Sequence, residues 1–379
     1  MDKNKIVCIG AGGAGGKLLD TLMNIDARYT PVFFNTNLSE MEVLENYDAK
    51  TNALYVAGAS GSGRDSKLAK ELIKKDQARL TNYFQSKFSE SSGVETFYIM
   101  ASGDGGSGSG SVSILTQVIK KRVNPRATVN LLIAAPKLSE KELSLKNFKR
   151  LWVDIKNLVD NKLVNSIQFI DNNKMYDEEE FNYEVMKEFD SGLSINSIEI
   201  DHQDSARVNN AKGYKVTLDV NSKYKPLKLA IDKAIESSNF ILPDTLECEY
   251  LLASFAEDGF DKDKVEDMFT VYGMAKTDYN DDEYEKNIVV LGGCQMPNSY
   301  MELIIAAEEE LKAEKAERDK KTGGFLNISL DEDEEEKFTE TNTTKEKTSG
   351  DVILLIPYWS SQRILCILSS ASDSSLPLK

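Results

Sequence analysis

The chain has 379 residues, a formal net charge of −16 and a single histidine. The acidic balance argues against direct binding to nucleic acid, which needs a basic surface to displace counterions. No apolar run approaches the ~20 residues of a membrane span, and no secretory signal is visible. The four cysteines show no paired spacing. This favours a reducing cytoplasm over a disulfide framework or a zinc site.

The first 180 residues predict a nucleotide-binding domain of α/β class. Short apolar runs alternate with helical patterns, which indicates a parallel sheet covered on both faces by helices. In such a sheet ligands bind at the carboxyl ends of the strands. The expected strands are residues 5–9, 32–34, 96–100, 129–134 and 167–170, with helices at 17–23 and 112–121.

The rest of the chain predicts a second, smaller α/β domain and a tail. A bridging helix and loop are expected over 181–205, although Gly192 is unfavourable inside a helix. The second domain spans 206–300, with strands at 214–220, 251–255, 271–275 and 288–291 and a helix at 227–236. A C-terminal helix at 301–321 carries the favourable pair Glu308 and Lys312. Residues 322–379 predict an acidic and polar, partly disordered tail with an apolar segment at 352–368.

The first motif with chemical meaning is the run of seven small residues at 10–16. Glycines let a backbone approach phosphate, and a helix N-terminus supplies N–H donors. The run contains GxGxxG, the dinucleotide pattern. That pattern requires an acidic residue after the second strand, and Asn35-Thr36-Asn37 stands there instead. Phosphate binding is therefore favoured over NAD binding, and over tight packing alone.

The second motif is SGDGGSGSGS at 102–111, again between a strand and a helix. Its serines can add hydroxyl donors to the backbone N–H groups. A flexible linker would not lie between the clearest strand of the chain and a good helix. Two glycine-rich loops at successive strand–helix junctions together predict a phosphate cradle.

A glycine loop followed about ninety residues later by DGGSGSG resembles the tubulin/FtsZ superfamily, with serine for both threonines and Asp104 for the first glycine. The resemblance covers roughly residues 5–300. It implies that residues 1–180 bind GTP or GDP, with Mg²⁺ held through the phosphates and no metal-binding side chain assigned. The implied nucleotide-binding residues are Gly12, Gly13, Ala14, Gly16, Lys17, Asn35, Thr36, Asn37, Gly61, Ser62, Gly63, Asp104, Gly105, Gly106, Ser107, Gly108, Ser109, Gly110, Glu140, Asn172, Phe181 and Asn182.

The resemblance also implies particular roles. Residues 61–63 would face the γ-phosphate, Glu140 would bind the ribose, and Asn172 would contact the nucleotide. Phe181 would stack on the base and Asn182 would hydrogen-bond it. The chain departs from the family pattern at Lys17, where an asparagine near the base is common, and at Asn37, which replaces an aspartate near the phosphates. Guanine specificity is therefore implied by the resemblance and not shown by the residues.

Asp201 and Asp204, followed by Gly213-Tyr214, resemble the family's synergy loop. This implies that both carboxylates enter the nucleotide site of the next subunit and catalyse hydrolysis there. A carboxylate can orient the attacking water or accept its proton. On spacing alone, a solvated charged turn explains the pair equally well.

The resemblance thus predicts a GTP-hydrolysing cytoskeletal protein that forms head-to-tail filaments. In its departures from the family pattern the chain resembles the divergent TubZ branch of plasmids and phages, whose filaments partition or position DNA. The resemblance implies a DNA-binding adaptor as a partner, which would bind the tail. The alternatives are an FtsZ-like cell-division GTPase, a nucleotide-binding regulator that does not polymerise, and an NAD(P)-binding oxidoreductase.

Overall fold

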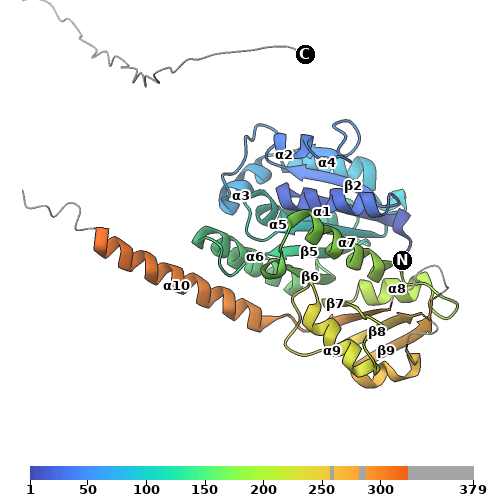
Figure 1. The fold of residues 1–379 in the computed structure, drawn as a ribbon. Helices are drawn as coiled ribbons and strands as arrows, with labels where there is room; N and C mark the ends of the chain where they lie inside the picture. The colour runs from blue at the N-terminus through green and yellow to red at the C-terminus, as the bar shows by residue number, and fades with distance from the viewer. Residues whose placement is uncertain (257–259, 281–286, 323–379) are drawn as a thin grey trace, which may run out of the picture. The chain divides into compact units, whose positions relative to one another are not determined.

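The computed structural model describes residues 1–256, 260–280 and 287–322. Within them a single sheet of ten strands runs in the order β3-β2-β1-β4-β5-β6-β7-β10-β8-β9 (Figure 1). The strands are β1 Ile6–Ala11, β2 Thr30–Asn35, β3 Ala53–Tyr55, β4 Thr96–Ser102, β5 Thr128–Ala135, β6 Ser166–Asp171, β7 Gly213–Asp219, β8 Glu247–Phe255, β9 Thr270–Tyr279 and β10 Ile288–Cys294.

The sheet is mostly parallel. Strands β1 to β6 pair with one another in parallel, and β6 continues to β7 through two parallel residue pairs, Ser166 with Gly213 and Ile167 with Tyr214. Strand β10 pairs antiparallel with both β7 and β8, and β8 pairs parallel with β9. Strands from both predicted domains therefore belong to one sheet, and the domain boundaries stay a prediction.

The described residues contain ten α-helices, of which α10 extends away from the sheet beyond its first turns (Figure 1). They are α1 Gly12–Ile25, α2 Ser39–Glu42, α3 Ser66–Lys75, α4 Gln77–Phe88, α5 Ser107–Val118, α6 Glu142–Asp160, α7 Glu178–Ser194, α8 His202–Asn209, α9 Leu227–Ser237 and α10 Asn298–Thr322. Alternate residues of one strand enter different cores: Val7 and Ile9 belong to the apolar cluster that includes residues of α3 to α6, α9 and α10, whereas Ile6 and Cys8 belong to the cluster that includes residues of α1 and α7. This period of two places an apolar core on each face.

Helix α7 begins three residues before the predicted bridging helix and ends at Ser194. Asp177 caps its N-terminus, accepting hydrogen bonds from the backbone N–H groups of Glu179 and Glu180. Figure 1 shows α7 lying beside α1. Gly192 lies inside this helix at a close contact with β7, where a Cβ would stand only 3.0 Å from Thr217 Cγ2.

The predicted mostly parallel α/β fold is confirmed. The sequence reading missed strand β3 and helices α2, α3, α4, α6 and α8. The predicted pair of Glu308 and Lys312 on α10 is confirmed, with the two charged groups 2.5 Å apart. No helix of the described ranges has the length and apolarity that crossing a membrane requires. The predicted tail, with its apolar segment 352–368, lies outside the described residues apart from the helix end at Thr322.

Candidate nucleotide site

A pocket of about 420 Å³ opens at the carboxyl ends of β1 and β4. Both glycine-rich loops contribute to its wall, together with the segments after β2 and β3. The lining residues are Ala11, Gly12, Gly13, Ala14, Asn37, Glu40, Ser60, Gly61, Ser62, Gly63, Arg64, Ser102, Asp104, Gly105, Gly106, Ser107 and Gly108. Four segments far apart in sequence thus form one polar cavity, because parallel strands end on the same edge of a sheet.

The two glycine loops pack directly on each other. Gly12 has a φ of +75°, and a Cβ there would stand 2.7 Å from the backbone nitrogen of Gly108. A Cβ on Gly108 would in turn stand 2.9 Å from the carbonyl oxygen of Ala11. At these two positions only glycine lets the backbones meet. A Cβ on Gly105 would approach only Ser102, at 4.0 Å, so this glycine borders open space.

Two helices begin at the pocket without a side-chain cap. Helix α1 follows Ala11 and helix α5 follows Gly106, and neither of these residues offers a side-chain acceptor to the first turn. The first N–H groups of a helix lack intrahelical partners and carry the positive end of its dipole. Two such ends at one cavity suit an anionic ligand with more than one phosphate.

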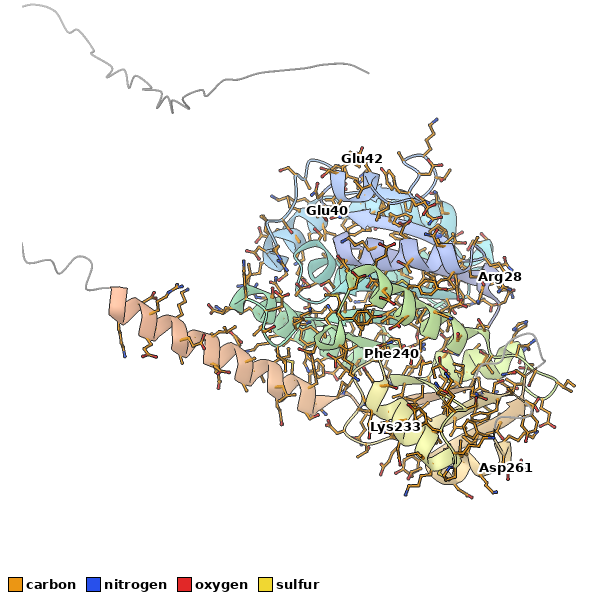
Figure 2. The ribbon with its side chains drawn as sticks, in the orientation of Figure 1. Arg28, Glu40, Glu42, Lys233, Phe240 and Asp261 are labelled. Atoms are coloured by element: carbon orange, nitrogen blue, oxygen red, sulfur yellow. The ribbon has the colours of Figure 1, made fainter. Side chains whose placement is uncertain are left out.

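The segment after β2 is fixed by its own side chains. Asn35 and Asn37 donate side-chain hydrogen bonds to the Glu40 carboxylate, at 2.9 and 3.1 Å. Thr36 and Ser107 share a hydroxyl hydrogen bond of 2.5 Å, which ties this segment to the second glycine loop. Glu40, which Figure 2 labels on α2, therefore brings a negative charge to the pocket wall although position 37 has none.

A third loop, residues 60–65, closes over the second glycine loop. A Cβ on Gly106 would lie 2.1 Å from Ser62 Oγ, so glycine is needed for this contact. Arg64 Nη2 lies 2.7 Å from Asp104 Oδ2 and forms an ion pair between the two loops. Burial raises the pKa of the Asp104 carboxyl; Arg64 partly opposes the rise and Glu140 adds to it.

Several other predicted nucleotide-binding residues do not line the pocket. Gly16, Ser109 and Gly110 are buried within α1 and α5. Lys17 is exposed and pairs with Glu178 at the start of α7, 2.8 Å away. Glu140 lies on the loop after β5, which is held to the turn at Asn172–Lys174 by a hydrogen bond from Leu138 N to Asn173 Oδ1.

Phe181 is placed where a stacking role is difficult. Its side chain is only 1% exposed and packs in the apolar cluster that also contains Leu18 and Leu22 of α1. A ring enclosed on that side can meet a base only if neighbouring side chains move. Asn182, the next residue, is half-buried. Base contacts by both residues stay predictions.

The sequence predicted a loop at Asp201 and Asp204. In the structure Asp201 is the N-cap residue of α8, and Asp204 lies in the first turn of this helix. They form a capping box at the start of α8: Asp201 accepts from the N–H groups of Gln203 and Asp204, and Asp204 accepts from the N–H of Asp201. Lys276 lies 2.5 Å from Asp204 and lowers the pKa of its carboxyl. The end of α8 contacts the start of the central strands, with Asn210 Oδ1 accepting from Asn130 Nδ2 at 2.6 Å.

Sequence reasoning missed several residues of the site. Glu40, Ser60 and Arg64 line the pocket, and Asn147 of α6 donates hydrogen bonds to two of its loops. Arg64 could have been found, because a basic residue directly after Gly61-Ser62-Gly63 suits a phosphate-facing loop. Asn147 gives no such signal, since it lies in an ordinary amphipathic helix.

A mostly parallel α/β sheet whose two glycine-rich turns face one polar pocket defines a phosphate-binding α/β protein. Residues 5–179 match the Tubulin/FtsZ family, GTPase domain, and this part of the chain is a tubulin/FtsZ-family GTPase domain. The chain is 24% identical over 356 residues to the Tubulin-like protein TubZ of Clostridium botulinum C phage, which covers 92% of this chain and 96% of the relative.

Solved structures of similar fold carry the same name. A tail-truncated TubZ of Clostridium botulinum phage c-st has a TM-score of 0.74 and 24% identity, over 83% of this chain and 100% of that one. A GTPγS-form protofilament of Bacillus thuringiensis serovar israelensis TubZ has a TM-score of 0.70 and 18% identity, over 83% and 94%. The predicted tubulin/FtsZ GTPase of TubZ type is confirmed, and nothing in these similarities supports an oxidoreductase.

Proposed function

We propose that this protein binds GTP in the pocket between its glycine loops and hydrolyses it within head-to-tail filaments. One observation carries the proposal: two uncapped helix N-termini meet at one cavity inside a tubulin/FtsZ-family GTPase domain. The similar Bacillus thuringiensis TubZ is a protofilament in its GTPγS form. Self-association of the same kind would complete the site of this chain.

Magnesium fits the donor set of this pocket. Mg²⁺ prefers oxygen ligands and is usually held by one or two carboxylates together with the phosphates of a substrate. The Asp104 carboxylate and the hydroxyls of Ser102 and Ser107 are such donors in the pocket wall. We assign the cation to these residues and the phosphates; when bound, it neutralises charge that develops on the phosphates. Within the described ranges, no group of three or more His, Cys, Asp and Glu residues forms a separate metal cluster.

Asp201 and Asp204 are proposed to act on the nucleotide of a neighbouring subunit. Asn210, at the end of α8, lies within 3.5 Å of Thr96, the first residue of β4, whereas Ser102 at the other end of β4 lines the pocket. Seven strand residues span roughly 20 Å, too far for a hydrogen bond in the same chain. A head-to-tail stack would bring α8 to the pocket of the next subunit.

The cellular role and location are proposals of the same kind. The name TubZ and the phage source of the relative fit a filament that partitions or positions plasmid or phage DNA. With a net charge of −16, the chain would reach DNA through a DNA-binding adaptor, for which the tail is our candidate site. The described cysteines Cys8, Cys248 and Cys294 are free thiols, which agrees with a cytoplasmic location.

Nucleotide titration and sedimentation test the proposal together. With magnesium present, the purified full chain should bind GTP at least tenfold more tightly than ATP. Added GTP should bring the protein into the pellet, and phosphate release per subunit should rise with protein concentration. Equal affinity for both nucleotides contradicts the guanine preference. Hydrolysis that is independent of protein concentration contradicts activation by assembly.

A further inference from the structure

The triphosphate pocket has an unusual charge balance. Among the described residues that line it, Glu40 and Asp104 are acidic and only Arg64 is basic. A nucleoside triphosphate adds about four negative charges, so bringing it between two carboxylates is unfavourable unless positive charge meets it. Backbone N–H groups supply partial charges only. The full positive charge of Arg64 is therefore the natural protein partner of the outermost phosphate.

The backbone at Arg64 indicates that its side chain is needed. Its φ is +62°, in the left-handed region that is unfavourable for a residue with a Cβ. Gly61 and Gly63 of the same loop also have positive φ, and a glycine at 64 would take this conformation without strain. An arginine in such a position is held for what its guanidinium contacts.

The structure fixes the backbone of both partners and leaves the guanidinium accessible. The buried Asn147 side chain donates to the carbonyl oxygens of Arg64 and Asp104, at 2.7 and 2.9 Å. The Arg64 side chain is 59% exposed, whereas that of Asp104 is 17% exposed. Rotation of the arginine side chain alone can thus move the positive charge away from Asp104 without moving either loop.

We infer that Arg64 binds the terminal phosphate of the triphosphate, exchanging its partner Asp104 for that phosphate. This inference rests on the proposed function, since it assumes that GTP occupies this pocket. Asp104, released from the arginine, then faces the cation that accompanies the phosphates. The ion pair thereby lets the pocket distinguish a diphosphate from a triphosphate. A diphosphate leaves the Arg64–Asp104 ion pair intact, whereas the terminal phosphate of a triphosphate takes the place of Asp104 as the partner of Arg64.

Equilibrium binding of GTPγS and GDP to two variants and a control tests the inference. Arg64→Gly removes the charge and suits the backbone. We expect about tenfold or greater loss of GTPγS affinity, with GDP affinity changed by less than about threefold and the melting temperature not lowered. Lys67→Ala removes a nearby exposed positive charge on α3 that does not line the pocket, and should change neither affinity.

Asp104→Asn separates the two partners. In EDTA it should bind GTPγS more tightly than the wild type, because the repelling carboxylate is gone. In magnesium this advantage should vanish or reverse. Equal losses of GDP and GTPγS affinity in Arg64→Gly would show that the ion pair only holds the loops, and would overturn the inference. A wild type that binds both nucleotides, with Arg64→Gly indistinguishable from Lys67→Ala, refutes the inference alone. A wild type that binds neither nucleotide refutes the proposed function itself.

Discussion

At the residue scale, the pocket depends on a side chain that lies outside every glycine loop. Asn147 is fully buried on α6. Its nitrogen donates to the carbonyls of Arg64 and Asp104, and its oxygen accepts from Ser66 Oγ at 2.8 Å. One amide thus joins the loop after β3 to the loop after β4, and this bond network holds the pocket in shape before any ligand arrives.

Replacing this amide should weaken both stability and binding. Asn147→Leu keeps the branched shape of the side chain but removes the amide, which leaves the loop carbonyls without their donor. We expect a loss on the order of 2 kcal/mol in the free energy of unfolding and about tenfold lower GTPγS affinity, because the loops must then be ordered on binding. Urea denaturation and nucleotide titration measure the two effects. Asn157→Leu, at an exposed position of the same helix, is the control. Unchanged GTPγS affinity in the destabilised variant would show that the loops keep their shape without Asn147.

The glycines of the pocket can be predicted from the sequence, whereas the polar side chains that support the pocket cannot. Gly12, Gly106 and Gly108 belong to contiguous runs, so their contribution to a cradle is visible in the sequence. Glu40 and Asn147 reach the pocket from separate elements, and their roles depend on hydrogen bonds formed only in the fold. No local pattern marks such residues.

At the element scale, α7 carries polar groups on its buried face. Asp190 is 9% exposed, pairs with Lys3 at 2.5 Å and accepts from the Tyr29 hydroxyl at 2.7 Å. Glu188 is 8% exposed. Burial raises its pKa to about 8, and Asp219 adds to the rise. A helix read from apolar spacing alone does not reveal these buried charges, since they interrupt the pattern.

Glu188 should make stability fall as the pH rises. Its pKa is 4.5 in the unfolded chain and about 8 in the fold, so between these values the folded state holds a proton that the unfolded state releases. The stabilisation present below about pH 4.5 is therefore lost progressively up to about pH 8. Glu188→Gln should remove this slope and be more stable at pH 8 by on the order of 2 kcal/mol.

Chemical denaturation from pH 5 to pH 8 measures the difference between this variant and the wild type. Lys215 is a second buried group, whose pKa burial lowers to about 7; its own contribution therefore rises with pH above about 7. Glu184→Gln, one turn earlier on the exposed side of α7, controls for the lost charge. A constant difference between Glu188→Gln and the wild type across this range would mean that Glu188 is ionised in the fold.

In helix α8 the two predicted catalytic residues, Asp201 and Asp204, also have a structural role that the sequence analysis did not predict. The spacing of Asp201 and Asp204 suits a family loop and also a capping box, in which each side chain satisfies a backbone N–H of the other. Both readings use the same residues. Alanine at either position would therefore remove a cap worth about 1 kcal/mol, whereas asparagine keeps a capping oxygen and removes only the charge.

At the scale of the whole molecule, the pocket and α8 occupy opposite ends of the central strands. The sequence predicted this polarity, because glycine loops follow strands and a long helix separates them from Asp201. It did not predict that β6 and β7 join all strands into one sheet, since that pairing involves only two residues on each strand. A rigid sheet between the two ends favours contacts with other subunits over closure within one chain.

A filament follows from this polarity if the two ends are complementary. A contact between unlike surfaces repeats indefinitely when its rotation does not close a ring. Catalysis is then shared between chains, with the pocket of one subunit and the aspartates of the next. Mutations can test this sharing, because a defect in the pocket and a defect in the aspartates can be placed in different chains that form one active site together.

Two kinds of variant supply the complementary defects. Asp201→Asn and Asp204→Asn keep the pocket and the α8 cap, and each should bind GTP normally and hydrolyse it at least tenfold more slowly. Gly105→Val fills the pocket, and its side chain is added at a position that borders only Ser102. Gly108→Val is less suitable, because its side chain would strike the backbone of Ala11 and Ser102 instead of the ligand space.

Mixing Asp201→Asn with Gly105→Val should restore part of the hydrolysis that neither protein shows alone. The first chain holds GTP, and the second presents intact aspartates to it in a mixed filament. Phosphate release measures the recovery, and sedimentation of a labelled Gly105→Val chain verifies co-assembly. The control replaces the second chain by Gly105→Val/Asp201→Asn, which can assemble equally well but carries no aspartate at 201, and should give no recovery. Co-assembly without recovery would show that Asp201 does not act across the subunit contact.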